Sequence, residues 1–162
     1  VSSTCCTRQG VVKVFWNNIP SWSHIKTLQS SESTFGDGYG SVVVVGESHV
    51  VVGAPYANFT TGNYSFVRAG RVYVYERNYG GPETFGLIET KQTTRRQGCV
   101  CTTGNCTLLV CNNFGPYGTS LSMSLRTILI GTGDSSRGSN LGNVVIDDAP
   151  GTLNVLLANL RC

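Results

Sequence analysis

The chain has 162 residues, of which 40% are hydrophobic and only 13% are charged, and its formal net charge is +3. This length suits one domain with a hydrophobic core. The positive charges are scattered, with Arg95-Arg96 as the only adjacent pair, which argues against nucleic-acid binding. Because no apolar run reaches the roughly 18–20 residues that cross a bilayer, we expect no membrane span. The chain begins at Val1 rather than Met, which indicates a processed product.

Strand signals, which are β-branched or alternating runs bounded by Gly, Pro and Asn, follow one another along the chain. One connection, Gly46-Glu47-Ser48-His49, is short enough to be a hairpin turn. The sequence therefore predicts an all-β fold. The predicted strands are, in chain order, residues 11–16, 22–28, 41–46, 49–53, 70–76, 84–89, 119–124, 127–131, 142–147 and 152–158.

One segment of the chain occurs twice with the same internal spacing. Gly40 follows Tyr39 ahead of an apolar run that ends at Gly53, and both glycines recur later in the chain, displaced by the same step, as Gly118 and Gly131. A constant offset keeps the lengths of strands and turns, so it indicates two copies of one supersecondary unit. Each copy carries four strand signals, which predicts a four-stranded antiparallel meander.

The N-terminal part of the chain carries only half of this unit. Its two strands match the third and fourth strands of the copies, and the first two strands have no clear counterpart upstream. Within one β domain over residues 1–162 we therefore expect about two and a half units. They are a half blade at 10–28, a blade at 35–90, a cysteine-rich insertion at 91–113 and a degenerate blade at 114–160.

These landmarks resemble the FG-GAP repeat, which builds integrin-α-type β-propellers. The residues that carry the resemblance are Phe35-Gly36 or Tyr39-Gly40, then Gly53-Ala54-Pro55, the strand from Gly70 to Tyr75, and the segment from Trp22 to Leu28. In the second copy Gly131-Thr132-Gly133 replaces Gly-Ala-Pro, so that copy matches less closely. The resemblance implies propeller-like blades. Closed propellers use about four to eight blades, so this incomplete propeller would need neighbouring subunits or a longer chain to complete it.

Seven cysteines point to an oxidising compartment. Within the insertion, Cys99-x-Cys101 and Cys106-x4-Cys111 suit either a small zinc knuckle or two local disulfides. The spacing favours disulfides, because zinc sites use two-to-four-residue spacers in both ligand pairs. Since the number is odd, at least one thiol is free or bonded to another chain. The candidate disulfide residues are Cys5, Cys6, Cys99, Cys101, Cys106, Cys111 and Cys162.

Three N-glycosylation sequons also favour an extracellular protein. They place candidate glycans on Asn58, Asn63 and Asn105, all in segments expected to be loops. Carbohydrate requires a solvated surface. We therefore expect covalent glycans and a secreted or cell-surface location, with Asn105 less favoured because its sequon contains Cys106.

The sequence offers no catalytic or metal-binding constellation. His24 is expected in a strand and His49 at a hairpin turn, and no Gly-x-Ser-x-Gly elbow is present. The stretch from Gly131 to Gly138 lacks the Lys-Ser/Thr of a phosphate loop. Calcium sites of the FG-GAP family lie between the first two blade strands, where this chain has too few oxygen ligands. We expect no enzyme activity, no cofactor and no metal.

The incomplete unit suggests the function. An isolated half blade exposes hydrophobic faces and unpaired edge groups, and a strand donated by a neighbouring copy would cover them. The favoured hypothesis is a secreted, glycosylated structural subunit that assembles head-to-tail into an extracellular filament, because a heterologous contact that does not close generates a fibre. Residues 1–9 or the region Leu153–Leu160 are candidate donors. The alternative is a ligand-binding or adhesion fragment of a larger integrin-like FG-GAP propeller protein.

Overall fold

The computed structural model describes residues 10–32, 34–62, 64–92, 99–102, 116–124, 127–132, 143–148 and 158–159. These residues form 13 β-strands and no helix, which confirms the all-β prediction. The strands make small antiparallel sheets, and the described residues contain no closed sheet. The propeller arrangement therefore stays a prediction.

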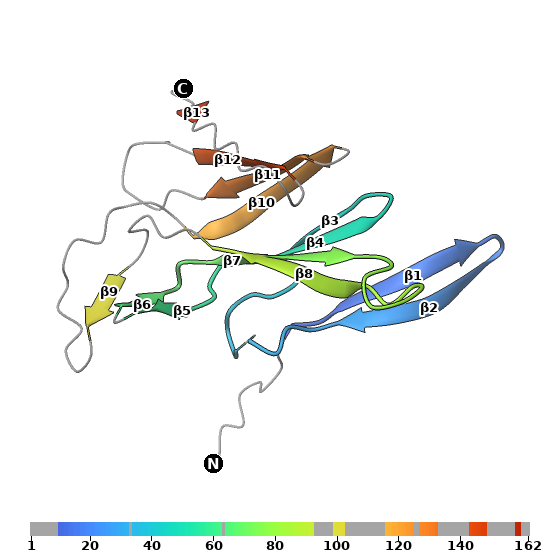
Figure 1. Cartoon of the computed structure of the whole chain (residues 1–162), viewed down its shortest axis with the longest axis horizontal. Coiled ribbons are helices and arrows are strands. Elements are labelled where there is room, and N and C mark those ends of the chain that lie inside the picture. The colour runs from blue at the N-terminus through green and yellow to red at the C-terminus, as the bar shows by residue number, and fades with distance from the viewer. Residues whose placement is uncertain are drawn as a thin grey trace, which may run out of the picture.

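Three of the sheets follow the predicted pattern of two, four and four strands, and they succeed one another across the molecule (Figure 1). We name them the half unit, the first unit and the second unit. The half unit pairs β1 (Val12–Asn18) with β2 (Ser21–Leu28). The first unit has the order β3 (Val42–Val45), β4 (His49–Ala54), β7 (Arg71–Glu76) and β8 (Gly86–Lys91). The second unit has the order β10 (Tyr117–Ser124), β11 (Thr127–Thr132), β12 (Asn143–Asp148) and β13 (Ala158–Asn159).

The fourth sheet was not predicted. It contains β5 (Phe59–Thr61), β6 (Tyr64–Val67) and β9 (Cys99–Thr102), and it projects at the side of the molecule away from the half unit (Figure 1). The segment with the sequons of Asn58 and Asn63 was expected to be a loop, and this expectation is wrong over these strands. The small apolar cluster of Phe59, Phe66 and Ala69 explains why a hairpin forms here. The stacked rings of Phe59 and Phe66, with centroids 4.6 Å apart, lie directly across the β5–β6 pair.

The first and second units share one strand register. Val42 pairs with Gly53 in the first unit, and Ser120 pairs with Gly131 in the second, so both partners are displaced by the same step. In the next pair, Gly53 faces Val72 and Gly131 faces Val144. The spacing of the glycines in the sequence therefore reflects equivalent pairing in two sheets.

The half unit has the same register as the outer half of the first unit. The pairing of β1 with β2 shifts between Val14 and Phe15, and that of β7 with β8 shifts between Val74 and Tyr75. The two irregularities lie at equivalent points. Val12, the first residue of β1, corresponds to Val72, the second residue of β7, so Val14 corresponds to Val74. Because β-bulges are specific features of a strand pair, the shared shift agrees with the prediction that β1 and β2 correspond to third and fourth strands.

Two hydrophobic clusters join consecutive units, and they are the same interface repeated. The first cluster lies between the half unit and the first unit, and the second lies between the first and second units. Six residues of the first cluster recur in the second at the offsets of the strands. They are Val12, Val14, Ile25, Tyr39, Val50 and Val52, which correspond to Val72, Val74, Ile88, Tyr117, Ile128 and Ile130.

Each interface joins two different faces, which we call the covering face and the receiving face. The covering face of the first unit carries Val72 and Val74, and the receiving face of the second unit carries Ile128 and Ile130. Burying each such side chain contributes about 1.5–3 kcal/mol. The contact between units, and not the two-stranded half unit by itself, therefore accounts for much of the stability of the fold.

Close backbone contacts of two glycines fix the spacing of the units. A Cβ on Gly10 would lie 1.9 Å from the carbonyl oxygen of Tyr39, and a Cβ on Gly70 would lie 2.1 Å from that of Tyr117. Any side chain would push the neighbouring unit away. The backbone N–H of Tyr117 also donates a hydrogen bond to the carbonyl of Ala69 at 2.9 Å. The repeat therefore preserves the contact between units as well as each unit.

Candidate assembly surface

β1 is an open edge in the described part of the chain. It pairs with β2 on one side, and no described strand pairs with its other side. Its counterpart β7 is paired on both sides, with β4 and with β8. Such an edge presents N–H and C=O groups that can bind another strand.

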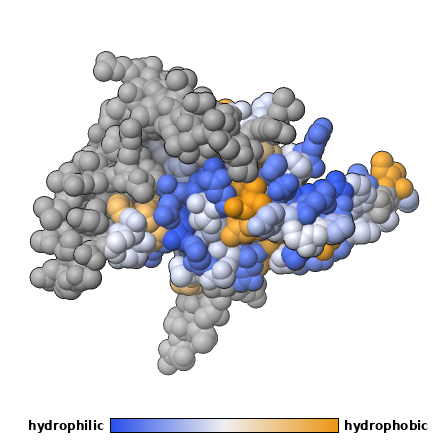
Figure 2. All heavy atoms as spheres, viewed as in Figure 1, coloured by the Kyte–Doolittle hydropathy of each residue, from blue (hydrophilic) through white to orange (hydrophobic). Residues whose placement is uncertain are grey.

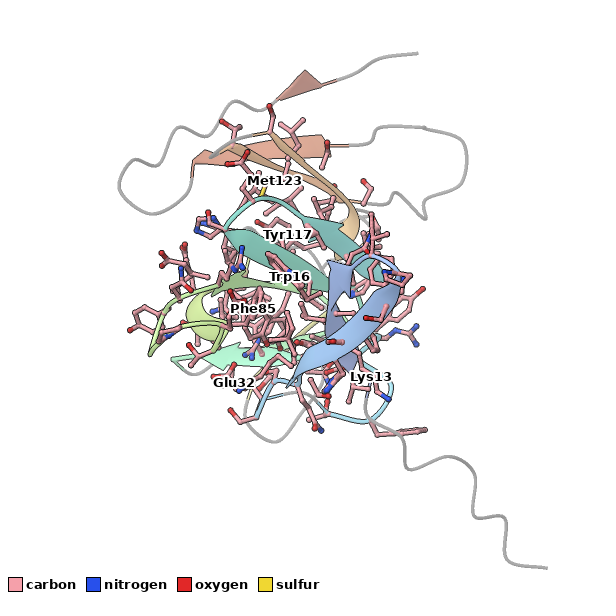
Figure 3. All side chains as sticks on the ribbon, turned by 90° about the vertical axis from the view of Figure 1, so that its right-hand side faces the viewer. Lys13, Trp16, Glu32, Phe85, Tyr117 and Met123 are labelled. Carbon is pink, nitrogen blue, oxygen red and sulfur yellow. The ribbon has the colours of Figure 1, made fainter. Side chains whose placement is uncertain are left out.

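A hydrophobic stripe on β3 lies on the receiving face of the first unit. Val43 and Val45, which we call the valine stripe, are 38% and 71% exposed. Their counterparts Leu121 and Met123 pack into the second cluster, where the first unit covers them. A Cβ on Gly46 would lie 2.4 Å from Met123 Cε, so this cover is close. Figure 3 shows Met123 at the boundary between the two units.

The difference between the two stripes has a simple cause. The first unit covers Leu121 and Met123 with its first two strands, β3 and β4, as the close approach of Gly46 and Gly53 to their side chains shows. Among the described strands the half unit has counterparts of only the third and fourth, so it buries Val50 and Val52 but leaves the valine stripe exposed. The open edge of β1 and the valine stripe therefore mark the same missing pair of strands.

The far end of the half unit is also apolar. Ile19, at the turn between β1 and β2, is 86% exposed, and Trp22 is 67% exposed. Phe15 is 47% exposed and meets the ring of His24 edge-on at 5.3 Å between centroids. Figure 2 shows hydrophobic residues at the tip of this ribbon. Apolar side chains gathered in this way are typical of interaction surfaces.

One cation–π contact ties the half unit to the first unit. The guanidinium of Arg77 lies 4.4 Å from the ring centroid of Trp16, whose position in the ribbon is labelled in Figure 3. Arg77 Nε also donates a hydrogen bond to Glu83 at 2.9 Å. This hydrogen bond lowers the pKa of the Glu83 carboxyl and raises the pKa of Arg77. The ion pair keeps the guanidinium in place beside the indole.

A buried tyrosine pair lies under the half unit. The hydroxyl groups of Tyr39 and Tyr75 share a hydrogen bond of 2.7 Å inside the first cluster. Burial raises the pKa of Tyr39, and the hydrogen bond to Tyr75 raises it further. Burial also raises the pKa of Tyr75. Both groups are therefore neutral in the folded chain near neutral pH.

Of the predicted glycosylation sites, Asn58 lies within the described residues. Its side chain is exposed just before β5, and Oδ1 accepts a hydrogen bond of 2.7 Å from the backbone N–H of Arg68. Thr60 of the same sequon is exposed and its hydroxyl contacts that of Ser65 at 3.2 Å. Asn63 and Asn105 lie outside the described residues.

Two of the candidate disulfide residues lie within the described residues. Cys99 and Cys101 belong to β9, which pairs with β6 through Val67 and Ser65. The remaining candidates, Cys5, Cys6, Cys106, Cys111 and Cys162, lie outside the described residues. The disulfides therefore stay a prediction.

The two histidines lie where the sequence indicated. His24 is an exposed residue of β2, and its Nε2 is 3.0 Å from the hydroxyl of Thr27. His49 is the first residue of β4 after the hairpin turn, and its Nδ1 is 2.8 Å from the hydroxyl of Ser48. Each histidine thus makes a local hydrogen bond within its own hairpin.

Within the described ranges, no group of three or more His, Cys, Asp or Glu side chains could hold a metal ion. The same part of the chain contains no helix long and apolar enough to cross a membrane. No family model matches the chain, and no match was found among curated proteins or solved structures. The resemblance to the FG-GAP repeat therefore rests on the motifs of the sequence.

The valine stripe is the part of this surface that sequence reasoning missed. Four successive valines at 42–45 read as a buried strand, and periodicity alone cannot show which of them stays exposed. A signal was present in the constant offset between the two copies, which equates Val45 with Met123. Combined with the two strands missing from the half unit, this correspondence predicts an uncovered Val45.

Proposed function

We propose that the protein is a self-assembling structural subunit, in which the open edge of β1 and the valine stripe together bind a neighbouring copy. The observation that carries this proposal is the contrast between two equivalent sites. One receiving face is covered by two strands, and the other has no counterpart of those strands in the described part of the chain. Exposed edges beside an apolar stripe are ordinarily paired or covered.

Head-to-tail assembly follows from the asymmetry of the units. The interface between units joins a covering face to a different, receiving face. A contact of this heterologous kind propagates into a filament unless its rotation closes a ring. The proposal is thus a filament of one chain, and the cysteines and sequons favour an extracellular, glycosylated filament.

The test is a charge placed on the valine stripe. Val45→Lys should leave the subunit folded, because this side chain is 71% exposed, but it would bury an ammonium group in the contact. The wild-type chain should form ordered multimers in light scattering and electron micrographs, and the variant should be a folded monomer. Val67→Lys is the matched control, since Val67 on β6 is 39% exposed and lies on a different sheet.

If the wild-type chain is a folded monomer at every concentration, the structural-subunit proposal is wrong. That outcome would favour the alternative, in which this sequence is part of a larger integrin-like adhesion protein and needs other sequences to complete it. If the wild-type and Val45→Lys chains assemble equally, the contact between copies lies on another surface.

Glycosylation is tested separately. The mass of the secreted protein should fall after enzymatic deglycosylation, and Asn58→Gln should remove one glycan. Its exposed position next to a solvated hairpin supports this expectation. An unchanged mass would remove the strongest support for the extracellular part of the proposal.

A further inference from the structure

Resting on the proposed function, we infer that the neighbouring copy occupies this site with β10 and β11 of its second unit. β10 would pair along the open edge of β1, and β11 would follow it. The two strands would fill the two positions that the half unit lacks, and the sheet would continue from β2 through β1 into the second unit of the next copy.

β10 is an unprotected edge. It lies at the end of its sheet, and beyond the contacts of Tyr117 and Gly118 with the first unit its outer side pairs with no described strand. Residues 119–124 contain no charged residue and no proline, the two features that most often block strand addition. β3 is also an edge, but it has only 4 residues, whereas β1 has 7 and β10 has 8.

The direction of the strands permits this pairing. β7, the counterpart of β1, has an antiparallel neighbour in β4, so the strand missing beside β1 should also run antiparallel. A second copy rotated by half a turn about the normal to the sheet presents β10 to β1 in the antiparallel direction. This rotation keeps its covering face turned toward the first unit of the first copy, so Val45 would be covered.

The side chains on both sides are complementary in size. Inside the chain, Gly46 lies over the large side chain of Met123. At the open site Val45 replaces Met123, and β11 of the second copy, which would take the place of β3, carries the exposed Leu129 on its covering face. A smaller residue below thus leaves room for a larger one above, which keeps the interface close-packed.

The covering face of the second unit is also partly exposed. Leu129 on β11 corresponds to Val51, which is fully buried against the second unit. Leu129 is 36% exposed, because none of the described residues continues the array beyond this sheet. The covering face of the second unit of a second copy is therefore available to bind the receiving face of the first unit.

The experiment mixes two chains that are each defective on one side. Val45→Lys disables the receiving site, and Ser122→Lys disables β10, where Ser122 is exposed. Alone, each variant should be a folded monomer. A 1:1 mixture should form dimers of twice the monomer mass and nothing larger, because only one combination of sites is intact. Ser31→Lys, an exposed serine outside both strands, should polymerise like the wild-type chain.

Two results would overturn this inference while leaving the proposed function intact. In the first, Ser122→Lys polymerises normally while Val45→Lys is monomeric, so another segment fills the site. In the second, the mixture stays monomeric although each single substitution blocks assembly. A wild-type chain that never assembles would instead contradict the proposed function, and this inference with it.

Discussion

The receiving faces of the first and second units have equivalent strands, but they differ in how far a neighbouring unit covers them. In the second unit, Leu121 and Met123 lie beneath the first unit, whereas in the first unit Val43 and Val45 remain exposed. Strand register, glycine positions and cluster residues otherwise agree. A molecule with an internal repeat therefore contains its own reference, since the covered copy shows what the exposed copy lacks.

The largest effect should come from disturbing the contact between units itself. Gly70 combines a positive φ of 86° with the close approach to Tyr117. Gly70→Ala should cost about 3 kcal/mol or more in the free energy of unfolding, from the left-handed backbone (about 1–2 kcal/mol) and from overpacking (about 1–3 kcal/mol). Urea unfolding would measure it.

Gly36→Ala is the matched control for that substitution. Gly36 has a nearly equal φ of 84°, but nothing lies within 4 Å of its Cβ position. It should cost only the backbone term, about 1–2 kcal/mol. Equal costs for the two substitutions would show that contact between the units contributes little at Gly70.

Truncating equivalent residues of the two stripes compares the faces directly. Met123→Ala should destabilise the monomer by about 2 kcal/mol, at the lower end for core methionines because Met123 is only partly buried. Val45→Ala should change it by less than about 0.5 kcal/mol, as an exposed substitution does. Urea or thermal unfolding would measure the Met123→Ala cost in the Val45→Lys background, which stays monomeric. The Val45→Ala chain would be measured at concentrations too low for assembly. These conditions separate the free energy of folding from that of assembly. A similar cost at both positions would contradict the asymmetry.

The buried tyrosine pair gives the interface a dependence on alkaline pH. Because the folded chain raises the pKa of Tyr39 and Tyr75, the unfolded chain releases these protons first above pH ~10. Folding stability is therefore retained below pH ~10 and falls above it, by up to about 1.4 kcal/mol per pH unit for each tyrosine. Unfolding at pH 9 and pH 11 should show a smaller loss in Tyr39→Phe/Tyr75→Phe. An unchanged loss would assign the effect to other groups.

The smallest effect concerns the attachment of the half unit. Arg77→Ala removes the cation–π contact with Trp16 and the ion pair with Glu83. Amide hydrogen exchange in β1 and β2 should become a few-fold faster, while exchange in β10 and β11 stays the same. Arg77→Lys should restore part of the protection. Uniform acceleration across both regions would indicate a global loss of stability instead.

Much of this architecture could be predicted from the sequence, because a repeat keeps the lengths of its strands. The offset between Gly40 and Gly118 correctly placed β3, β4, β10 and β11 within a few residues. The predicted strand at 152–158 is different, since only its last residue lies in described chain, within β13.

The β5–β6 hairpin was missed although it carried a local signal. Gly62-Asn63 between two short runs is a sequence pattern typical of a two-residue hairpin turn. The strands are only 3 and 4 residues long, so the polar composition of the segment suggested a loop. The pairing of β6 with the distant β9 depends on tertiary contacts that no local pattern records.

Only part of the candidate surface could be predicted from the sequence, because the rest depends on packing between sheets. The sequence predicted a half unit with open edges, and β1 has no second neighbour among the described strands. Whether Val45 or Val44 is exposed depends on which face the half unit covers. The contact of Arg77 with Trp16 joins residues that are distant in the sequence, and side-chain packing between sheets decides it.

The connection between the second and third strands of each unit varies in length without affecting the sheet. It covers positions 55–70 in the first unit and the shorter range 133–142 in the second, yet the strand register is the same. In the first unit this connection carries the β5–β6 hairpin out to the side of the molecule (Figure 1). The pairing of the strands in the sheets is thus independent of the connection that projects from the side of the molecule. In an array of such subunits, this connection would display foreign peptides or new binding loops at regular intervals while the sheets keep their pairing.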